Sequence, residues 1–188
     1  WTYPNFIKLM DQLNVASENS DMSFSVRCEN TGLEYNGTSI NSLFAQRRNI
    51  LRPSFLKMVY DIIRFNKQTV SMLEKNLVSD DETLGEFVQK HKYSKSFVNY
   101  YIVPMGAAIW SASEEVMLAF PLKFFLNFFN NHGMLSVDER PQWRVISQGS
   151  QSYIKPITEP YKDRIRLNTP VEKIERMPEG VNVHTSHG

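Results

Sequence analysis

The sequence carries two stretches in which apolar and polar residues alternate, and a long block with helical spacing lies between them. Alternation of period two is typical of a strand with one buried face. Residues 22–36 alternate on both sides of a turn at Gly32, which predicts a β-hairpin. Residues 171–185 alternate on both sides of a turn at 177–180, which predicts a second hairpin. Strands at the two ends and helices between them predict an α+β fold.

From Ser42 the apolar residues recur at helical spacing. Pro53 stands where a first helical turn tolerates proline, Thr83 can cap a helix that runs through His91, and Gly133 can end an aromatic helix. The expected helices of this block span 53–69, 84–91, 94–110 and 120–130. Outside it we expect a helix at 6–13, a strand at 143–146, a short helix that opens at Gly149 and Ser150, and a strand at 165–170.

Glycine spacing argues against a complete nucleotide-binding loop in this chain. There are eight glycines, and no two of them are spaced as G-x-G, so neither a dinucleotide loop nor a Walker loop is present. The single cysteine, Cys28, cannot form an internal disulfide. It alternates with Met22, Phe24 and Val26, which predicts that it is a small inward-facing hydrophobe.

No catalytic residue stands out, and no metal site is predicted. The chain has no G-x-S-x-G nucleophile motif, and Ser150 is interpreted as a helix cap. The four histidines form no motif with metal-ligand spacing. The net charge of +1 does not favour a nucleic-acid partner.

One segment of the helical block is strongly basic. It holds Arg47, Arg48, Arg52, Lys57, Arg64 and Lys67, against Asp61 alone. A basic amphipathic helix can lie on an anionic membrane surface, and it can equally be an ordinary surface helix with a solvated basic face. We expect a cytoplasmic protein, with peripheral membrane association through Arg47, Arg48 and Arg52 as an open alternative.

Two apolar stretches can form either plain core or the wall of a ligand pocket. Residues 120–129 contain five of the twelve phenylalanines and are apolar nearly all round. In residues 104–112 a proline frees backbone groups and Gly106 permits close approach of another backbone or a flat ligand.

Several segments taken together resemble the bacterial predicted NAD/FAD-binding proteins of the flavin-containing amine oxidoreductase superfamily. The resemblance covers nearly the whole chain. It rests on WTYPNF at 1–6, SDMSFSV at 20–26, GLEYNG at 32–37, LRP at 51–53, PMGAAIWS at 104–111, NHG at 131–133 and PQWRV at 141–145.

The resemblance implies an internal fragment, because members of this superfamily carry an N-terminal Gly-rich Rossmann loop and a C-terminal flavin segment. Residues 1–140 would then be a mainly helical substrate (cap) domain with a β-hairpin. Residues 141–188 would be a returning part of the FAD-binding domain with a small antiparallel β-meander. FAD is the implied cofactor, and we expect this chain alone to bind it weakly or not at all, because the pyrophosphate site is missing.

Site residues follow from the same resemblance where positions match. The backbone of Val171 corresponds to the adenine contact, Gly149 to the second glycine of a Gly-Gly pair whose first position is Gln148, and Trp143 and Arg144 to a strand that runs toward the flavin. The residues that would face the substrate are Phe24, Tyr35, Met105, Gly106, Ala107, Ile109, Trp110, Phe124 and Phe128.

Three functions of different classes fit these observations. The first is the substrate domain of an FAD-dependent, amine oxidase-like oxidoreductase that moves hydride from a C–N or C–C bond of an apolar substrate to flavin. The second is a membrane-surface or lipid-binding module without catalysis of its own. The third is a folded fragment that is inactive in isolation.

Overall fold

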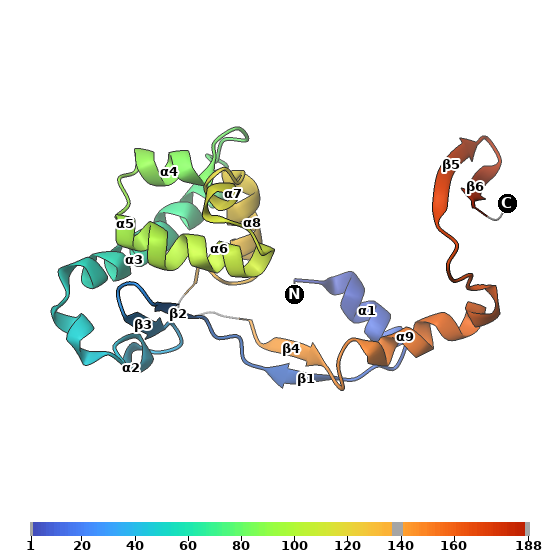
Figure 1. Cartoon of the computed structure of the whole chain (residues 1–188), viewed down its shortest axis with the longest axis horizontal. Helices are drawn as coiled ribbons and strands as arrows, with labels where there is room; N and C mark the ends of the chain where they lie inside the picture. The colour runs from blue at the N-terminus through green and yellow to red at the C-terminus, as the bar shows by residue number, and fades with distance from the viewer. Residues whose placement is uncertain (1, 137–140, 187–188) are drawn as a thin grey trace. The chain divides into compact units, whose positions relative to one another are not determined.

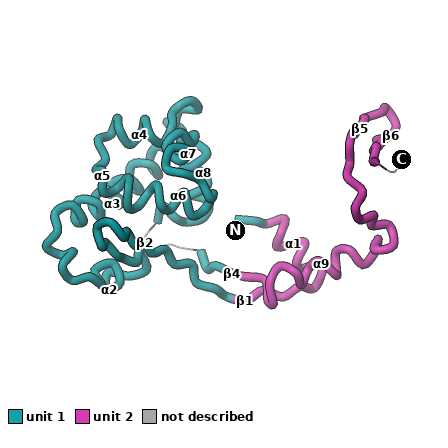
Figure 2. Tube along the Cα trace, in the orientation of Figure 1, with its two compact units in different colours: residues 1–3, 19–144 teal, residues 4–18, 145–188 magenta. Residues whose placement is uncertain are grey.

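The computed structural model describes residues 2–136 and 141–186. It divides into two compact units, each built from two separate stretches of sequence (Figure 2). The boundary expected after residue 140 falls on residues outside the described part. Nothing in the sequence pointed to the grouping of 4–18 with the C-terminal part. Unit 1 holds residues 1–3 and 19–144, and unit 2 holds residues 4–18 and 145–188.

The first predicted hairpin is confirmed. β2 (Ser25–Cys28) pairs with β3 (Leu33–Asn36) in antiparallel register, with Val26 opposite Tyr35 and Cys28 opposite Leu33. Side chains of one face, those of Val26 and Cys28 among them, pack against the core of unit 1, as the alternation predicts. Leu33 and Tyr35 from the second strand are themselves buried.

Most of unit 1 outside this hairpin is helical (Figure 1), and local capping sets the limits of several helices. The Glu86 amide donates to the Thr83 hydroxyl at 3.2 Å, and the Thr83 amide donates back to the Glu86 carboxylate at 2.8 Å, a capping box. Pro53 lies in a first turn, and Gly133, at φ 66°, follows a last turn. The helices are α2 (Ile40–Leu43), η1 (Arg47–Leu51), α3 (Pro53–Glu74), α4 (Leu84–Lys90), α5 (Lys95–Phe97), η2 (Val98–Ile102), α6 (Val103–Trp110), α7 (Glu114–Leu118) and α8 (Leu122–Asn131).

The proline in the segment 94–110 is accommodated by a π-helical turn. η2 has π-helical geometry, and Pro104 follows it in the first turn of α6. In an uninterrupted α-helix the carbonyl of Tyr100 would accept from the amide of residue 104, which a proline lacks. The Tyr35 hydroxyl donates to that carbonyl at 2.6 Å. The hairpin therefore donates to a carbonyl whose α-helical donor is replaced by proline.

We expect Tyr35→Phe to lower the free energy of unfolding by about 1 kcal/mol, because the Tyr100 carbonyl loses a buried donor. Burial raises the pKa of Tyr35, so the hydroxyl remains a donor over the usual pH range. Urea denaturation measures the change. Tyr161→Phe is the matched control, because Tyr161 is 45 % exposed and should lose nothing measurable. An equal loss in both variants would contradict this role for Tyr35.

The core of unit 1 is dominated by phenylalanine. Phe65 of α3 lies at its centre, with ring centroids 5.9 Å from Phe87, 5.7 Å from Tyr93 and 5.4 Å from Phe97. The fully buried ring of Phe65 thus contacts residues of both α4 and α5. The largest fully buried side chains are Phe55, Phe65, Phe87, Phe97, Phe125, Phe129, Met58, Leu84, Ile102, Met117, Leu122 and Leu126.

A buried carboxylate on α3 fixes the loop that leads into α5. Asp61 is 0 % exposed, and its Oδ2 accepts from the Ser94 amide at 2.9 Å. Its Oδ1 lies 3.1 Å from Lys57 Nζ and 3.1 Å from Arg64 Nη2. The guanidinium of Arg64 also stacks over the Tyr93 ring, 3.9 Å from its centroid. The one acid of the basic segment is therefore a structural centre that is withdrawn from the surface.

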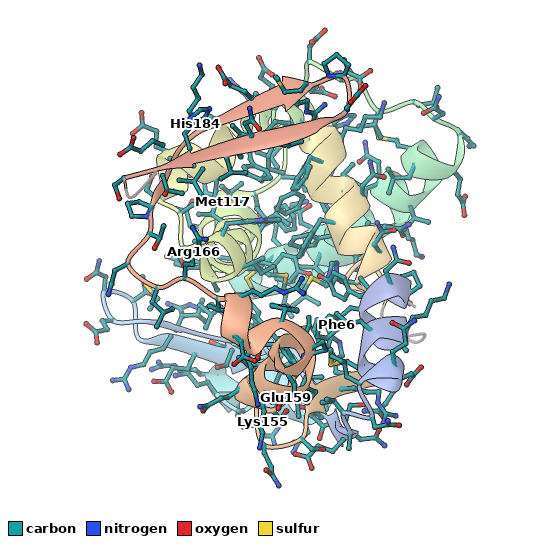
Figure 3. The ribbon with its side chains drawn as sticks, turned by 90° about the vertical axis from the view of Figure 1, so that its right-hand side faces the viewer. Phe6, Met117, Lys155, Glu159, Arg166 and His184 are labelled. Carbon is teal, nitrogen blue, oxygen red and sulfur yellow. The ribbon has the colours of Figure 1, made fainter. Side chains whose placement is uncertain are left out.

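The described part of unit 2 contains three short helical elements and the second predicted hairpin, which is also confirmed. Phe6 of α1 points toward α9, where its ring lies 5.9 Å from that of Tyr153 (Figure 3). A further strand pair, β1 with β4, spans the division between the units. These elements are α1 (Pro4–Gln12), β1 (Ser17–Ser20), β4 (Trp143–Ile146), α9 (Gln151–Thr158), η3 (Glu159–Arg164), β5 (Val171–Met177) and β6 (Gly180–Thr185).

Two local predictions in this region are wrong. Residues 165–170 form no strand: Asn168 has φ 54°, and Leu167 is 80 % exposed. An alternating sequence does not form a strand without a partner strand, and the described chain provides no partner for this segment. Ser150 stands at the N-cap position of α9, but its side chain makes no capping hydrogen bond, because its backbone is helical rather than extended.

Candidate functional site

A partly exposed aromatic cluster forms where α6 ends against α8. The Trp110 ring centroid lies 4.8 Å from that of Phe120, 4.9 Å from that of Phe128 and 6.4 Å from that of Phe124. Phe124 is 57 % exposed, whereas its neighbour Phe125 is fully buried. We call Trp110, Phe120, Phe124 and Phe128 the aromatic cluster. It brings together three of the predicted substrate-facing residues and presents aromatic rings that can bind an apolar ligand.

Close helix packing positions Trp110. A Cβ on Gly106 would lie 2.4 Å from Met117 Cε and 3.4 Å from Phe125 Cε2, so α6 approaches both side chains because this position is glycine. Met117 is fully buried inside unit 1 (Figure 3). Ser111, at φ 51°, then ends α6 directly after Trp110. The structure thus fills the space over Gly106 with side chains of its own core.

A histidine that the sequence did not single out as a site residue adjoins this cluster. His132 stacks on Phe128 at 4.0 Å and lies 6.2 Å from Trp143, the predicted flavin-side residue. Its Nδ1 donates to the Phe128 carbonyl at 2.7 Å, since a carbonyl can only accept. Its Nε2 forms a hydrogen bond with the Tyr3 hydroxyl at 2.9 Å. Only three-dimensional proximity reveals this pair, because Tyr3 and His132 are far apart in the sequence.

The other residues predicted to face a substrate lie along the same helical segment or at the hairpin. Phe24 meets Tyr101 at 6.5 Å, and Tyr35 is bonded to Tyr100 as described above. Met105, Ala107 and Ile109 are partly buried against the core. Met105, Ala107 and Ile109 thus lie within α6, which ends at Trp110. Phe24 and Tyr35 contact the preceding element, η2.

A separate cavity of about 250 Å³ lies between the hairpin turn and the first turn of α3. Arg52, Ser54 and Ser96 line its polar side, and Phe55 and Met58 line its apolar side. Its lining includes none of the residues predicted to face a substrate.

The predicted flavin-side residues fall in both units. Trp143 and Arg144 stand in the part of β4 that belongs to unit 1, and Arg144 Nη1 lies 3.4 Å from Asn19 Oδ1. Gly149 has φ 85°, and no described atom lies within 4 Å of where its Cβ would be. Val171 begins β5 opposite Thr185, and the register shifts between Val171 and residue 173. A shift of this kind leaves backbone groups outside the ladder.

Among residues 2–136 and 141–186, no three His, Cys, Asp or Glu side chains gather closely enough to hold a metal ion. In the same part of the chain, no helix combines the length and the apolar character needed to cross a bilayer.

Comparison with known families supplies the deciding observation. The family model described as flavin containing amine oxidoreductase matches the chain over residues 1–188. The chain belongs to this family. No curated protein matched it. Membership supports an oxidoreductase-like function that depends on a flavin cofactor. The expected superfamily is therefore confirmed.

The residues at the predicted flavin contacts fit such a group. Gly149 has a left-handed backbone that is open to the approach of a ligand, and a side chain there would be strained. The register shift at Val171 leaves backbone polar groups that can bond to a heterocycle. In the described part of the chain both positions are exposed, Val171 to 54 %.

Proposed function

We propose that this chain forms the substrate-domain portion of an FAD-dependent, amine oxidase-like oxidoreductase acting on an apolar substrate. Membership of the flavin containing amine oxidoreductase family supports the reaction class. The single observation that supports an apolar substrate is the aromatic cluster, in which half-buried rings surround an exposed Phe124. Bound FAD would supply the acceptor for a hydride from a C–N or C–C bond of the substrate.

The proposed work of the protein residues is binding, orientation and exclusion of water. Trp110, Phe124 and Phe128 would hold an apolar group by burying its surface. Gly149 and Val171 would contact the cofactor through their backbones, and Trp143 and Arg144 of β4 would be further contacts. The predicted domain assignment, a helical cap followed by a returning part of the FAD domain, belongs to the same proposal.

The cofactor is tested on protein purified from its own host. We expect flavin absorbance in the visible range, and we expect FAD after heat release and chromatography. Absence of flavin together with no uptake of added FAD would overturn the proposal, and release of FMN would overturn the choice of FAD. The chain expressed alone should bind FAD weakly, because its sequence has no Gly-rich loop for the pyrophosphate.

Phe124→Ala tests the substrate class. We expect the KM for a long alkylamine to rise about five- to tenfold, because the variant loses roughly half the apolar contact of a phenyl ring. The KM for a short amine should change less than twofold. Leu77→Ala is the matched control, because Leu77 is similarly exposed at 65 % and lies outside the cluster. Flavin reduction by each amine measures the effect, and equal effects on long and short amines would argue against the cluster as a substrate wall.

A further inference from the structure

The edge of unit 1 carries exposed aliphatic side chains next to arginines. Residues 40–52, which we call the basic tip, contain α2 and η1 and lead into α3 (Figure 1). Ile40 is 80 % exposed and Leu51 is 87 % exposed, values far above those of ordinary aliphatic residues. Arg47, Arg48 and Arg52 lie in the same stretch, which contains no aspartate or glutamate. The tip is thus both apolar and cationic.

Its exposed side chains are held in place by an ordered base. Phe44 packs on Phe55 with ring centroids 5.6 Å apart, and Asn49 is fully buried. Arg48 Nη2 and Gln46 Nε2 both donate to the Gly32 carbonyl, at 2.8 and 2.9 Å. Arg47 joins η1 to α2 by donating to Asn41 Oδ1 at 2.7 Å. Ile40 and Leu51 therefore project from a packed structure, and no other part of the described chain shields these two side chains from water.

Exposed apolar side chains continue from the tip along α3, and few acidic side chains lie on the elements next to it. Its outer face exposes Leu56, Tyr60 and Ile63, which share one side of the helix at spacings of four and three residues. Asp61 is fully buried. On the hairpin, Glu34 is paired with Arg27 at 3.3 Å, and Glu29 stands in the turn. The tip itself carries three arginines and no carboxylate.

We infer that the basic tip docks on the surface of an anionic lipid bilayer. Aliphatic side chains flanked by arginines match the layered chemistry of that surface, with acyl chains beneath phosphate headgroups. A second copy of the chain would oppose arginines to arginines, which disfavours a symmetric contact. Nucleic acid offers phosphates but gives Ile40 and Leu51 no apolar layer to enter. The inference does not depend on the flavin.

Co-sedimentation of the full chain with vesicles tests it. We expect the protein to pellet with phosphatidylglycerol-containing vesicles, to stay in the supernatant with pure phosphatidylcholine, and to be released by salt. Arg47→Gln with Arg52→Gln should weaken binding about twenty-fivefold, at roughly fivefold for each arginine. Ile40→Gln with Leu51→Gln should weaken it at least about tenfold. Both side chains are so exposed that folding should be unaffected, and circular dichroism verifies this.

Matched controls remove equivalent groups elsewhere. Lys8→Gln with Lys155→Gln removes two exposed cations, and Leu77→Gln with Leu167→Gln removes two exposed aliphatic side chains. Both controls should bind vesicles within twofold of the wild type. The inference is overturned if the wild type does not pellet, if it pellets equally with phosphatidylcholine, or if the controls weaken binding as much as the tip variants. A dimer that light scattering detects and Ile40→Gln with Leu51→Gln dissociates would also overturn it.

Discussion

Phe125→Ala should lower the free energy of unfolding by about 3–5 kcal/mol, the usual loss when a fully buried phenyl ring is removed. The Phe125 ring stacks on Phe129 with centroids 4.0 Å apart and approaches Trp110 at 5.8 Å. It also forms part of the surface against which Gly106 packs. Truncation would therefore leave a cavity between α6 and α8 that rigid neighbours cannot fill.

The adjacent residue provides the control. Phe124→Ala removes the same atoms from a ring that is 57 % exposed, and it should cost less than about 1 kcal/mol. Urea denaturation followed by tryptophan fluorescence and by circular dichroism gives both values. Similar losses of stability in the two variants would contradict the packing seen here, in which α8 turns Phe125 toward the core and Phe124 toward the surface. Together with the amine kinetics, the pair separates a residue that supports the helix from one that is available to a ligand.

Asp61→Ala should lower the free energy of unfolding by about 3 kcal/mol. Removing one partner of a buried ion pair leaves the other charges uncompensated. Here the variant would also leave the Ser94 amide without its acceptor at the start of α5. Asp80→Ala is the matched control, because its pair with Lys123 lies on the surface and should contribute less than about 1 kcal/mol. A loss at Asp61 no larger than at Asp80 would contradict its structural role.

The same carboxylate sets a pH dependence. Burial alone would raise the pKa of Asp61, but hydrogen bonds from Ser94 and Lys57 outweigh it and hold the pKa below the usual 3.8. A carboxylate with a lowered pKa in the folded state stabilises that state above pH 3.8, and the contribution disappears as the pH falls through the folded pKa. The stability difference between wild type and Asp61→Ala should therefore shrink below about pH 4. Denaturation at a series of pH values measures it.

The sequence could predict those parts of the fold that depend on local signals. Thr83 and Glu86 form a capping box from residues three apart, and Gly133 ends α8 through its own backbone angle. The hairpins at Gly32 and at 177–180 likewise depend on neighbours in the chain. Such features are settled by a few adjacent residues, so pattern recognition suffices.

Features that depend on distant partners were missed. β1 is a polar strand, SENS, which exists because it pairs with β4, and the stretch 165–170 alternates without a partner and stays irregular. The pattern of 120–129 could not separate Phe124 from Phe125, because a helix apolar all round has no face marked as outward. The pair of Tyr3 and His132 gave no local signal. Of the proposed site, the aromatic residues were foreseen as a group and their histidine neighbour was not.

The bond between Tyr35 and the Tyr100 carbonyl has a consequence for local stability. Pro104 offers that carbonyl no α-helical donor, so docking of the hairpin adds a hydrogen bond that stabilises the segment. Local opening of the hairpin should therefore also loosen the segment from η2 to α6, and amide hydrogens in both should exchange with similar free energies. A proline that looks like a local defect thus couples two distant elements into one cooperative unit.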